Sequence, residues 1–395
     1  MFHNRRSEDD RGEQRREPPH PPAPAPALYR GQEHGAGYPA QDPAPAEGGP
    51  APVYDWQRDG AWPPGGPTAR PPAPAPAPAP APERQSAPRH AGAPGTVAAE
   101  WRPIHLGTAA PEFDTKPPAR VLSYRPDTVC DGWSTPALDV RLASVRGYAH
   151  RAEGRPREDD VAAAWEETTG AVVFAVADGV SDAGQPHIGS QLACRSAIDE
   201  LLRQVRAGDG FVTDWPTLLG TVHWQLRAQA ARLLKRRDGQ DASVEETADL
   251  LATTLVAGAA TPTRDGVRVA LVSVGDSGAW AIKYQELYPL KGGKTLGADG
   301  LVSSAVQPLP YVPADIEPFH FHLDPASVLL LGTDGFGDPV GDGRGMVARL
   351  FAEELGGPPP PLAFAYLLDF YRETFDDDRS LIALWPRAGA PGGQR

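Results

Sequence analysis

Residues 171–179 have the sequence AVVFAVADG, a run of small and β-branched apolar side chains that ends in Asp178 and Gly179. A short apolar run bounded by Asp-Gly predicts a strand that is buried on both faces. This strand delivers a carboxylate at its end, and burying that group is costly unless a cation or several hydrogen bonds compensate. We therefore expect a central strand that ends at a charged site.

Two further apolar runs end in the same way. Residues 327–335, SVLLLGTDG, end in Asp334 and Gly335, and residues 267–277, VRVALVSVGDS, lead to Asp276. Three core strands that each place an aspartate at the carboxyl end predict a single cation-binding rim.

The other periodic segments come in runs of one type. Helical spacing is found at residues 188–205, 215–234, 346–355 and 362–375, and Ser243 with Glu246 forms a capping-box pattern for a further short helix. Strands are predicted at residues 138–150, 253–260, 267–277, 280–288, 328–331 and 380–385. Runs of strands and runs of helices favour a layered α+β fold over a doubly wound parallel sheet.

The N-terminal third has a different composition. Of the 46 prolines, 27 precede residue 121, and Pro71–Pro82 is an almost regular Pro-Ala alternation. Such a segment predicts a disordered, locally polyproline-II tail. We divide the chain into a tail (1–120), a folded domain (121–386) and a disordered C-terminus (387–395). The aromatic cluster of Tyr54, Trp56 and Trp62 in the tail is either part of a linker or a docking motif for a partner.

Charge and cysteine use restrict the class of protein. The tail is nearly neutral, with 13 basic and 14 acidic residues, whereas the remaining residues hold 25 basic and 37 acidic groups. An acidic domain argues against nucleic acid or an anionic membrane as partner. The chain has no apolar stretch of bilayer length and no signal-peptide core, and Cys130 and Cys194 lack metal-ligand or redox spacing. A soluble, cytoplasmic protein is expected.

Four acidic residues fall at strand edges or in the turns beside them: Asp159, Asp178, Asp334 and Asp377. Each alone is typical of a turn or a solvated surface, but together they indicate a metal site. No His/Cys cluster of zinc spacing accompanies them, so a hard ion, Mg²⁺ or Mn²⁺, is implied. Two such ions ~3.5–4 Å apart, bridged by one aspartate, lower the pKa of a shared water and suit phosphoester hydrolysis.

The motifs resemble those of a known family. The segments GYAHRAEGRPREDD, VVFAVADG, TTLVAGAAT, VALVSVGDSGAW, LLLGTDGFGD and DDRSLIAL occur in the order of the metal-dependent protein serine/threonine phosphatases, type 2C or PPM, and are most similar to the bacterial branch. The resemblance covers roughly residues 138–386. It implies a four-layer α-β-β-α sandwich with two central antiparallel sheets, and hydrolysis of phosphoserine and phosphothreonine in phosphorylated proteins by a hydroxide bridging two Mg²⁺ or Mn²⁺ ions.

The resemblance also implies a set of metal-binding positions: Glu158, Asp159, Asp178, Gly179, Asp276, Asp334 and Asp377. In this set Asp178 corresponds to the bridging aspartate, with the Gly179 carbonyl on the second ion. Asp334 and Asp377 correspond to ligands of the first ion, and Asp159 with Glu158 would hold waters of the second. Asp276 corresponds to a ligand of a weaker third ion found in some members.

The sequence departs from the family pattern at the phosphate-binding position. Where an arginine is common, this chain has Gly154, so Arg155, Arg151 or His150 is expected to bind the phosphate. His150 would also serve as general acid to the leaving group, with a packing histidine as the alternative. The glycine pair usual after Asp-Gly is replaced by 180–182, VSD, and the flap, 291–313, is short.

Two other functions are compatible with the sequence. The domain could be a catalytically silent module that binds phosphoproteins, although four retained carboxylates argue against it. The Pro-rich tail could instead carry the function, as a scaffold for domains with aromatic grooves.

Overall fold

The computed structural model describes residues 102–108, 113–118, 125–237, 240–292 and 307–387. All of them belong to one compact unit, Tyr54–Arg395. Most of the predicted tail, the final eight residues and much of the predicted flap lie outside the described residues. Two segments of the region expected to lack structure, 102–108 and 113–118, contact the folded domain.

Two antiparallel sheets lie at the centre of this unit. The first has the order β10-β7-β6-β5-β4 and contains β4 (Asp160–Trp165), β5 (Val172–Ala177), β6 (Leu255–Thr263), β7 (Gly266–Val274) and β10 (Phe319–Leu323). The second has the order β2-β3-β13-β11-β8-β9 and contains β2 (Thr128–Ser134), β3 (Leu138–Val145), β8 (Gly278–Lys283), β9 (Glu286–Lys291), β11 (Val328–Gly332) and β13 (Arg379–Pro386).

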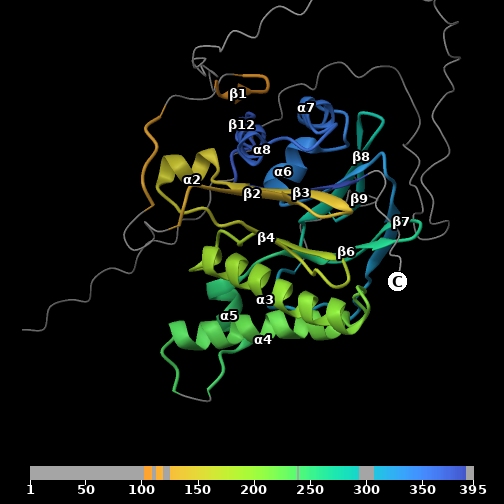
Figure 1. Cartoon of the computed structure of the whole chain (residues 1–395). Coiled ribbons are helices and arrows are strands. Elements are labelled where there is room, and N and C mark those ends of the chain that lie inside the picture. The colour runs from red at the N-terminus through yellow and green to blue at the C-terminus, as the bar shows by residue number, and fades with distance from the viewer. Residues whose placement is uncertain (1–101, 109–112, 119–124, 238–239, 293–306, 388–395) are drawn as a thin grey trace, which may run out of the picture. The chain divides into compact units, whose positions relative to one another are not determined.

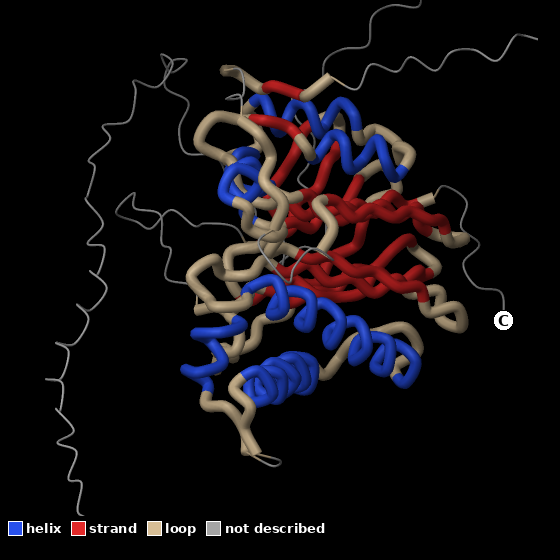
Figure 2. The backbone as a smooth tube through the Cα atoms, turned by 90° about the vertical axis from the view of Figure 1, so that its left-hand side faces the viewer, coloured by secondary structure: helices blue, strands red, loops and turns tan. Residues whose placement is uncertain are grey.

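Helices cover the outer face of each sheet, so that the sheets are stacked between two helical layers (Figures 1 and 2). The five-stranded sheet is covered by α3 (Pro186–Ala207), with α4 (Trp215–Leu233) and α5 (Val244–Leu251) beyond it. The six-stranded sheet is covered by α6 (Asp334–Val340), α7 (Met346–Glu354) and α8 (Pro361–Leu368). The α+β fold with two antiparallel sheets flanked by helices is confirmed.

Strand β5 shows how alternation builds the layers. Val172, Phe174 and Val176 pack toward the six-stranded sheet, in one cluster with Leu329 and Leu331 of β11. The intervening side chains pack against α3 and α4. All six residues of β5 are buried, as predicted from its sequence. Because full burial of one valine or phenylalanine stabilises a fold by about 1.5–3 kcal/mol, this strand is firmly fixed.

Several predicted elements end elsewhere than expected. The strand predicted over 138–150 stops at Val145, and a six-residue helix, α2 (Tyr148–Glu153), follows it and ends at Gly154, with φ 79°. The helix predicted over 362–375 ends at Leu368 and gives way to β12 (Phe370–Tyr371), which pairs in parallel with β1 (Ile104–His105). Helix α6 and strands β2, β4 and β10 were not predicted. Long-range packing of short segments, which periodicity does not register, explains these differences.

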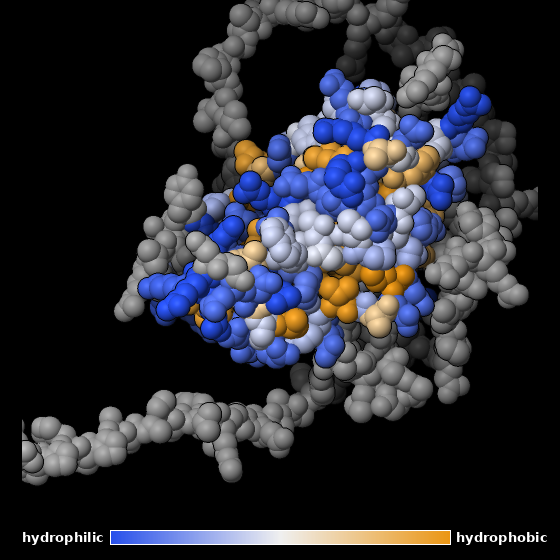
Figure 3. Space-filling model, turned by 90° about the horizontal axis from the view of Figure 1, so that it is seen from below, coloured by the Kyte–Doolittle hydropathy of each residue, from blue (hydrophilic) through white to orange (hydrophobic). Residues whose placement is uncertain are grey.

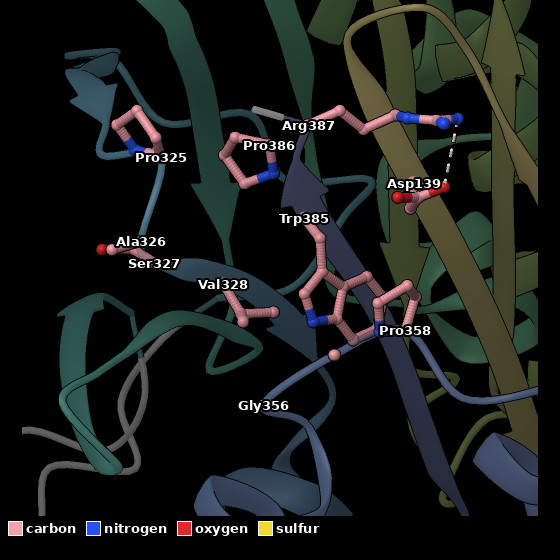
Figure 4. Close-up of a pocket in the computed structure, with 11 residues that line it drawn as sticks. Asp139, Pro325, Ala326, Ser327, Val328, Gly356, Pro358, Trp385, Pro386 and Arg387 are labelled. Carbon is pink, nitrogen blue, oxygen red and sulfur yellow. Dashed lines mark ion pairs between the residues drawn. The ribbon is translucent and has the colours of Figure 1, made fainter. Parts of the chain in front are cut away.

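The strands of the six-stranded sheet have different surroundings at their two ends, which we call the site edge and the opposite edge. The site edge holds the end of β11 and the start of β13, where the predicted carboxylates lie. The opposite edge holds a surface pocket of about 370 Å³ lined by Val328, Trp385 and prolines, with an ion pair between Asp139 and Arg387 at 3.6 Å (Figure 4).

Figure 3 shows the face of the molecule on the side of α4 and α5, which is mostly hydrophilic with separate apolar areas. Trp224 of α4 is 58% exposed. Among the described helices, none combines the length and apolar character needed to cross a bilayer.

Candidate functional site

The predicted carboxylates lie at the ends of four strands, on the same side of the two stacked sheets. Asp159 directly precedes β4 and Asp178 directly follows β5, and these two strands pair so that Asp160 lies opposite Ala177. Asp334 follows β11 after one residue, and Asp377 precedes β13 by two residues. Each sheet therefore contributes two of the four carboxylates.

The four side chains interact electrostatically in the folded protein. The carboxyl groups of Asp178 and Asp334 lie within hydrogen-bonding range of each other. Burial raises the pKa of Asp178 well above its usual value, and the charges of Asp159, Asp334 and Asp377 raise it further. Burial, followed by the charges of neighbouring aspartates, has the same effect on the pKa of Asp159, which is only 1% exposed. Such a cluster is unfavourable without a cation.

Asp377 lies at the outer side of the cluster. The residue as a whole is exposed. Its carboxyl group is nevertheless desolvated by the surrounding protein, and this desolvation, followed by the charges of Asp378 and Asp334, raises its pKa to about 6.

Thr333 joins the two sheets at this edge. Its hydroxyl donates a hydrogen bond to Asp159 Oδ2 at 2.7 Å and accepts one from the Ser380 N–H at 3.0 Å. Thr333 is fully buried. Because Asp159 belongs to the five-stranded side and Ser380 to β13, this hydroxyl fixes the carboxylate relative to the second sheet.

Two glycines allow the backbones around Asp377 and Asp378 to approach closely. A Cβ atom at Gly335 would overlap the carbonyl oxygen of Asp378, and one at Gly147 would overlap the backbone of Asp377. The segment that carries Asp377 can therefore lie directly against the start of α6 and the start of α2.

His150 lies in a buried ion pair rather than in the open site. Its Nδ1 is 3.0 Å from Asp378 Oδ1 and its Nε2 is 3.8 Å from Glu158 Oε2. Burial alone would lower the pKa of His150, but Asp378, followed by Glu158, outweighs it and raises this pKa to about 9. Asp378 also accepts hydrogen bonds from the N–H groups of Gly147 and Glu158. At neutral pH His150 is thus a cation that neutralises Asp378.

Glu158 is held by three partners. Besides His150, it receives a hydrogen bond from the Ser181 hydroxyl at 2.9 Å and pairs with Arg155 Nη2 at 2.9 Å. Burial raises its pKa in spite of these partners. The Arg155 side chain is 34% exposed, and the same guanidinium donates to the Ser181 carbonyl at 2.7 Å. Arg155 is therefore a cation at the accessible rim of the cluster.

Two further predicted positions, Gly179 and Asp276, are next in the chain to residues with contacts around Asp178. Gly179 forms an isolated antiparallel bridge with Thr253. Asp276 lies between β7 and β8 next to Ser277, whose hydroxyl is 2.7 Å from that of Thr254; Thr254 in turn accepts the Asp178 N–H at 3.0 Å. Asp276 is thus linked to the site through its neighbours.

The donor set fits a hard divalent cation. The clustered carboxylates supply oxygen ligands, which Mg²⁺ and Mn²⁺ prefer, and a cation would relieve the repulsion that raises their pKa values. Among the described residues, His150, Asp377 and Asp378 are the group of three or more whose ligand atoms all lie within 4.8 Å of one another. This group shares Asp377 with the four clustered carboxylates, so the two sets of ligands adjoin at Asp377.

A known protein family matches most of the region that carries these residues. The family model described as "Protein phosphatase 2C" matches residues 146–353. The chain belongs to the protein phosphatase 2C family. The matched region begins just before α2 and contains β4, β5, β11 and the first three of the four clustered aspartates, while Asp377 lies beyond it. Among curated proteins, no sequence matches this family member.

Several solved structures resemble the chain. The catalytic domain of the serine/threonine protein phosphatase PstP, in complex with 2 manganese ions, is 20% identical, with a TM-score of 0.43 over 63% of this chain and 98% of that one. PstP/Ppp of Mycobacterium tuberculosis is 19% identical (TM-score 0.42, 63% and 98% covered), and PppA of Pseudomonas aeruginosa is 16% identical (TM-score 0.41, 65% and 100% covered). At these values the similarities say nothing of this protein's activity.

The site residues that the sequence did not reveal are mainly those that hydrogen-bond to the predicted ligands or to their neighbours. Thr333 stands in the LLLGTDG run, directly before a predicted ligand, yet its partner Asp159 is 174 positions away. Asp378 directly follows the predicted ligand Asp377, yet its contacts are with His150, Gly147 and Glu158, which precede it by about 220 positions or more. Only the position of Thr333 beside Asp334 could have drawn attention to it.

Proposed function

We propose that this family member is a metal-dependent protein serine/threonine phosphatase. The observation that carries the proposal is the convergence of Asp159, Asp178, Asp334 and Asp377 at one edge, two from each sheet. A binding module would not need this accumulation of buried negative charge. Phosphorylated proteins would be its substrates.

Two divalent ions at this edge would supply a water of lowered pKa and positive charge for the phosphoryl oxygens. The protein's part is to place the ligands. Asp178, Asp334 and Asp377 would hold the first ion, with Asp178 shared by the second, and Thr333 would keep Asp159 oriented. The Gly179 carbonyl and Glu158 would complete the second position, and Asp276 would serve a weaker third.

Three basic residues were candidates for binding the phosphate, and their contacts favour Arg155. Arg151 pairs with Asp127 and Asp369 at 2.9 and 2.8 Å, so its charge is already satisfied. His150 is 4% exposed and paired with Asp378. Arg155 pairs with one carboxylate, Glu158, rather than two, and its side chain is 34% exposed, against 12% for Arg151. At this rim its guanidinium would bind phosphate oxygens. We assign His150 to positioning Asp378 and Glu158.

The test is hydrolysis of p-nitrophenyl phosphate and of a phosphothreonine peptide by the full-length protein, with and without Mn²⁺ or Mg²⁺. Activity should require the metal and fall by more than about 10²-fold in Asp178→Asn, the loss typical of removing one group that stabilises charge in a transition state. Asp139→Asn, an aspartate at the opposite sheet edge, is the matched control and should retain activity. A metal-loaded protein that binds the phosphopeptide without hydrolysing it would instead support the silent module.

Arg155→Lys tests the phosphate assignment. Lysine keeps the charge but loses the planar fork, so KM for the phosphopeptide should rise while metal affinity stays unchanged. An unchanged KM would remove Arg155 from this role.

A further inference from the structure

The two described segments 102–108 and 113–118, here called the strap, lie against the elements that carry half of the proposed site. They precede the region matched by the family model and lie upstream of β2. Their contacts include α2 and residues 370–373. The Tyr366 hydroxyl of α8 also donates to the Arg102 carbonyl, and Ile104 and Leu106 pack against the apolar cluster of α7 and α8.

Residues 113–118 contact α2. The Lys116 N–H donates to the Arg151 carbonyl at 2.9 Å, and Arg146 Nη2 bridges the carbonyls of Lys116 and His150 at 2.9 and 2.7 Å. The rings of Phe113 and Tyr148 meet edge-on at 6.2 Å between centroids. This half of the strap therefore contacts the helix that carries His150.

Residues 102–108 contact β12 and the turn after it. Ile104 and His105 pair in parallel with Phe370 and Tyr371. Beyond them, the Leu106 carbonyl accepts a hydrogen bond from Arg372 Nη1 at 3.0 Å, and the Thr108 hydroxyl donates to Glu373 at 2.6 Å. This turn leads directly to Asp376, Asp377 and Asp378.

The two contacted elements meet at the site. The Ala149 N–H donates to the Asp376 carbonyl at 3.0 Å, and the Gly147 N–H donates to Asp378 Oδ1 at 2.6 Å. Tyr148 and Tyr371 make an edge-on ring contact at 5.1 Å. The strap thus contacts both sides of the junction that presents Asp377.

Neither element is stable through its own local interactions. Helix α2 has six residues, and no side chain caps its N-terminus. Isolated helices of fewer than ~12 residues are marginal in water, and a two-residue strand has no independent stability. Their order must come from tertiary contacts, and the strap supplies several of these.

We infer that the strap is a positioning element for the metal site: it holds α2 and residues 370–378 in the geometry that binds the ion ligated by Asp377. The metal part of this inference rests on the proposed function.

The test uses the full-length protein with two strap variants. Phe113→Ala removes the ring contact with Tyr148, and Lys116→Pro removes the N–H that bonds Arg151, while the Lys116 side chain itself is exposed. The matched controls are Asp114→Ala and Thr115→Pro. Both residues are exposed, and the described part of the chain shows no hydrogen bond for either.

The first readout is amide hydrogen exchange without metal. In both strap variants, exchange should accelerate about tenfold or more in α2 and residues 370–378, with α3 unchanged and the controls like the parent protein. The second is Mn²⁺ affinity by calorimetry, which should weaken ~10–100-fold, as for other groups that orient metal ligands. Unchanged exchange in α2 and 370–378, or equal acceleration throughout the domain, would overturn the inference. If exchange accelerates in the strap variants as expected but the parent protein binds no Mn²⁺, the result would instead count against the proposed function.

Discussion

Charged side chains are buried at one end of the strands β3, β11 and β13 and exposed at the other end of the same three strands. At the site edge, β11, β13 and β3 lead to a cluster in which Asp159, Asp378, Glu158 and His150 are all less than 5% exposed. At the opposite edge the charges stay at the surface: in the Asp139–Arg387 pair the side chains are 20% and 45% exposed. Both polar residues, among them Ser327, and apolar residues line the pocket there.

The difference in burial shows at which end of the strands the fold accommodates repulsion between buried charges. Buried like charges are destabilising unless a counter-charge is present, and the raised pKa values of Asp159, Asp178 and Asp377 record that cost. The opposite edge carries no such cost. A difference of this kind between two ends of one sheet is expected where one end has evolved for cation binding.

The largest expected effect is on metal-dependent stability. Saturating Mn²⁺ at about 100 times its dissociation constant should stabilise the protein by about 2.7 kcal/mol, seen as a rise in melting temperature. Asp334→Asn should abolish that rise, while its metal-free melting temperature equals or exceeds that of the parent protein, because one repelling charge is gone. Thermal unfolding with and without Mn²⁺ measures both. An equal metal response in both proteins would contradict a site at this edge.

A smaller effect is expected from Thr333→Val, which leaves Asp159 without its hydroxyl donor. Stability should fall by about 1–3 kcal/mol, and Mn²⁺ affinity by roughly 10–100-fold. Thr135→Val is the matched control at the other edge. The Thr135 hydroxyl is also buried and bonds the backbone of Leu138, so stability should fall but Mn²⁺ affinity should not. Thr333→Ser should restore affinity; if it does not, the hydroxyl is not the relevant group.

A pH-dependent effect of similar size concerns His187, at the start of α3. Burial, followed by the charge of Arg125, lowers its pKa to about 4. The unfolded chain takes up this proton near pH 6.5, whereas the folded protein resists it, so stability is full above that pH and is lost as pH falls toward 4. Between pH 7.5 and 5 the loss attributable to His187 should be about 2 kcal/mol. Denaturation of His187→Gln should show a correspondingly smaller pH dependence; an identical slope would refute the assignment.

The smallest effect is expected from Asp139→Asn, which breaks the exposed pair with Arg387. Its cost should be below about 1 kcal/mol and should shrink further with added salt. Urea titration at two salt concentrations measures it. A larger loss of stability that does not depend on salt would mean that the charges at the opposite edge are as strongly coupled as those at the site edge.

Much of the fold was predictable because its strands are long apolar runs. β5 and β11 were recognised from composition and their Asp-Gly ends, and α5 from the Ser243–Glu246 capping box, in which both hydrogen bonds are present. Helix α2 was missed because its order comes from contacts with distant segments, and its residues continue the alternation of β3.

The site was predictable in a similar, partial way. The four aspartates were found because each stands at the end of an apolar run or in a turn beside one, and the structure brings them together. Their roles as ligands stay a prediction. Thr333 and Asp378 act through partners more than 170 positions away, at Asp159 and Gly147, and such pairing is not visible in a single sequence.

The equal contribution of carboxylates from the two sheets has a consequence for assembly. Asp159 and Asp178 come from one layer and Asp334 and Asp377 from the other, so neither layer alone holds all four predicted ligands. Uptake of Mn²⁺ during refolding would therefore mark the moment at which the layers dock, and would report on late maturation of the domain rather than on early formation of its strands.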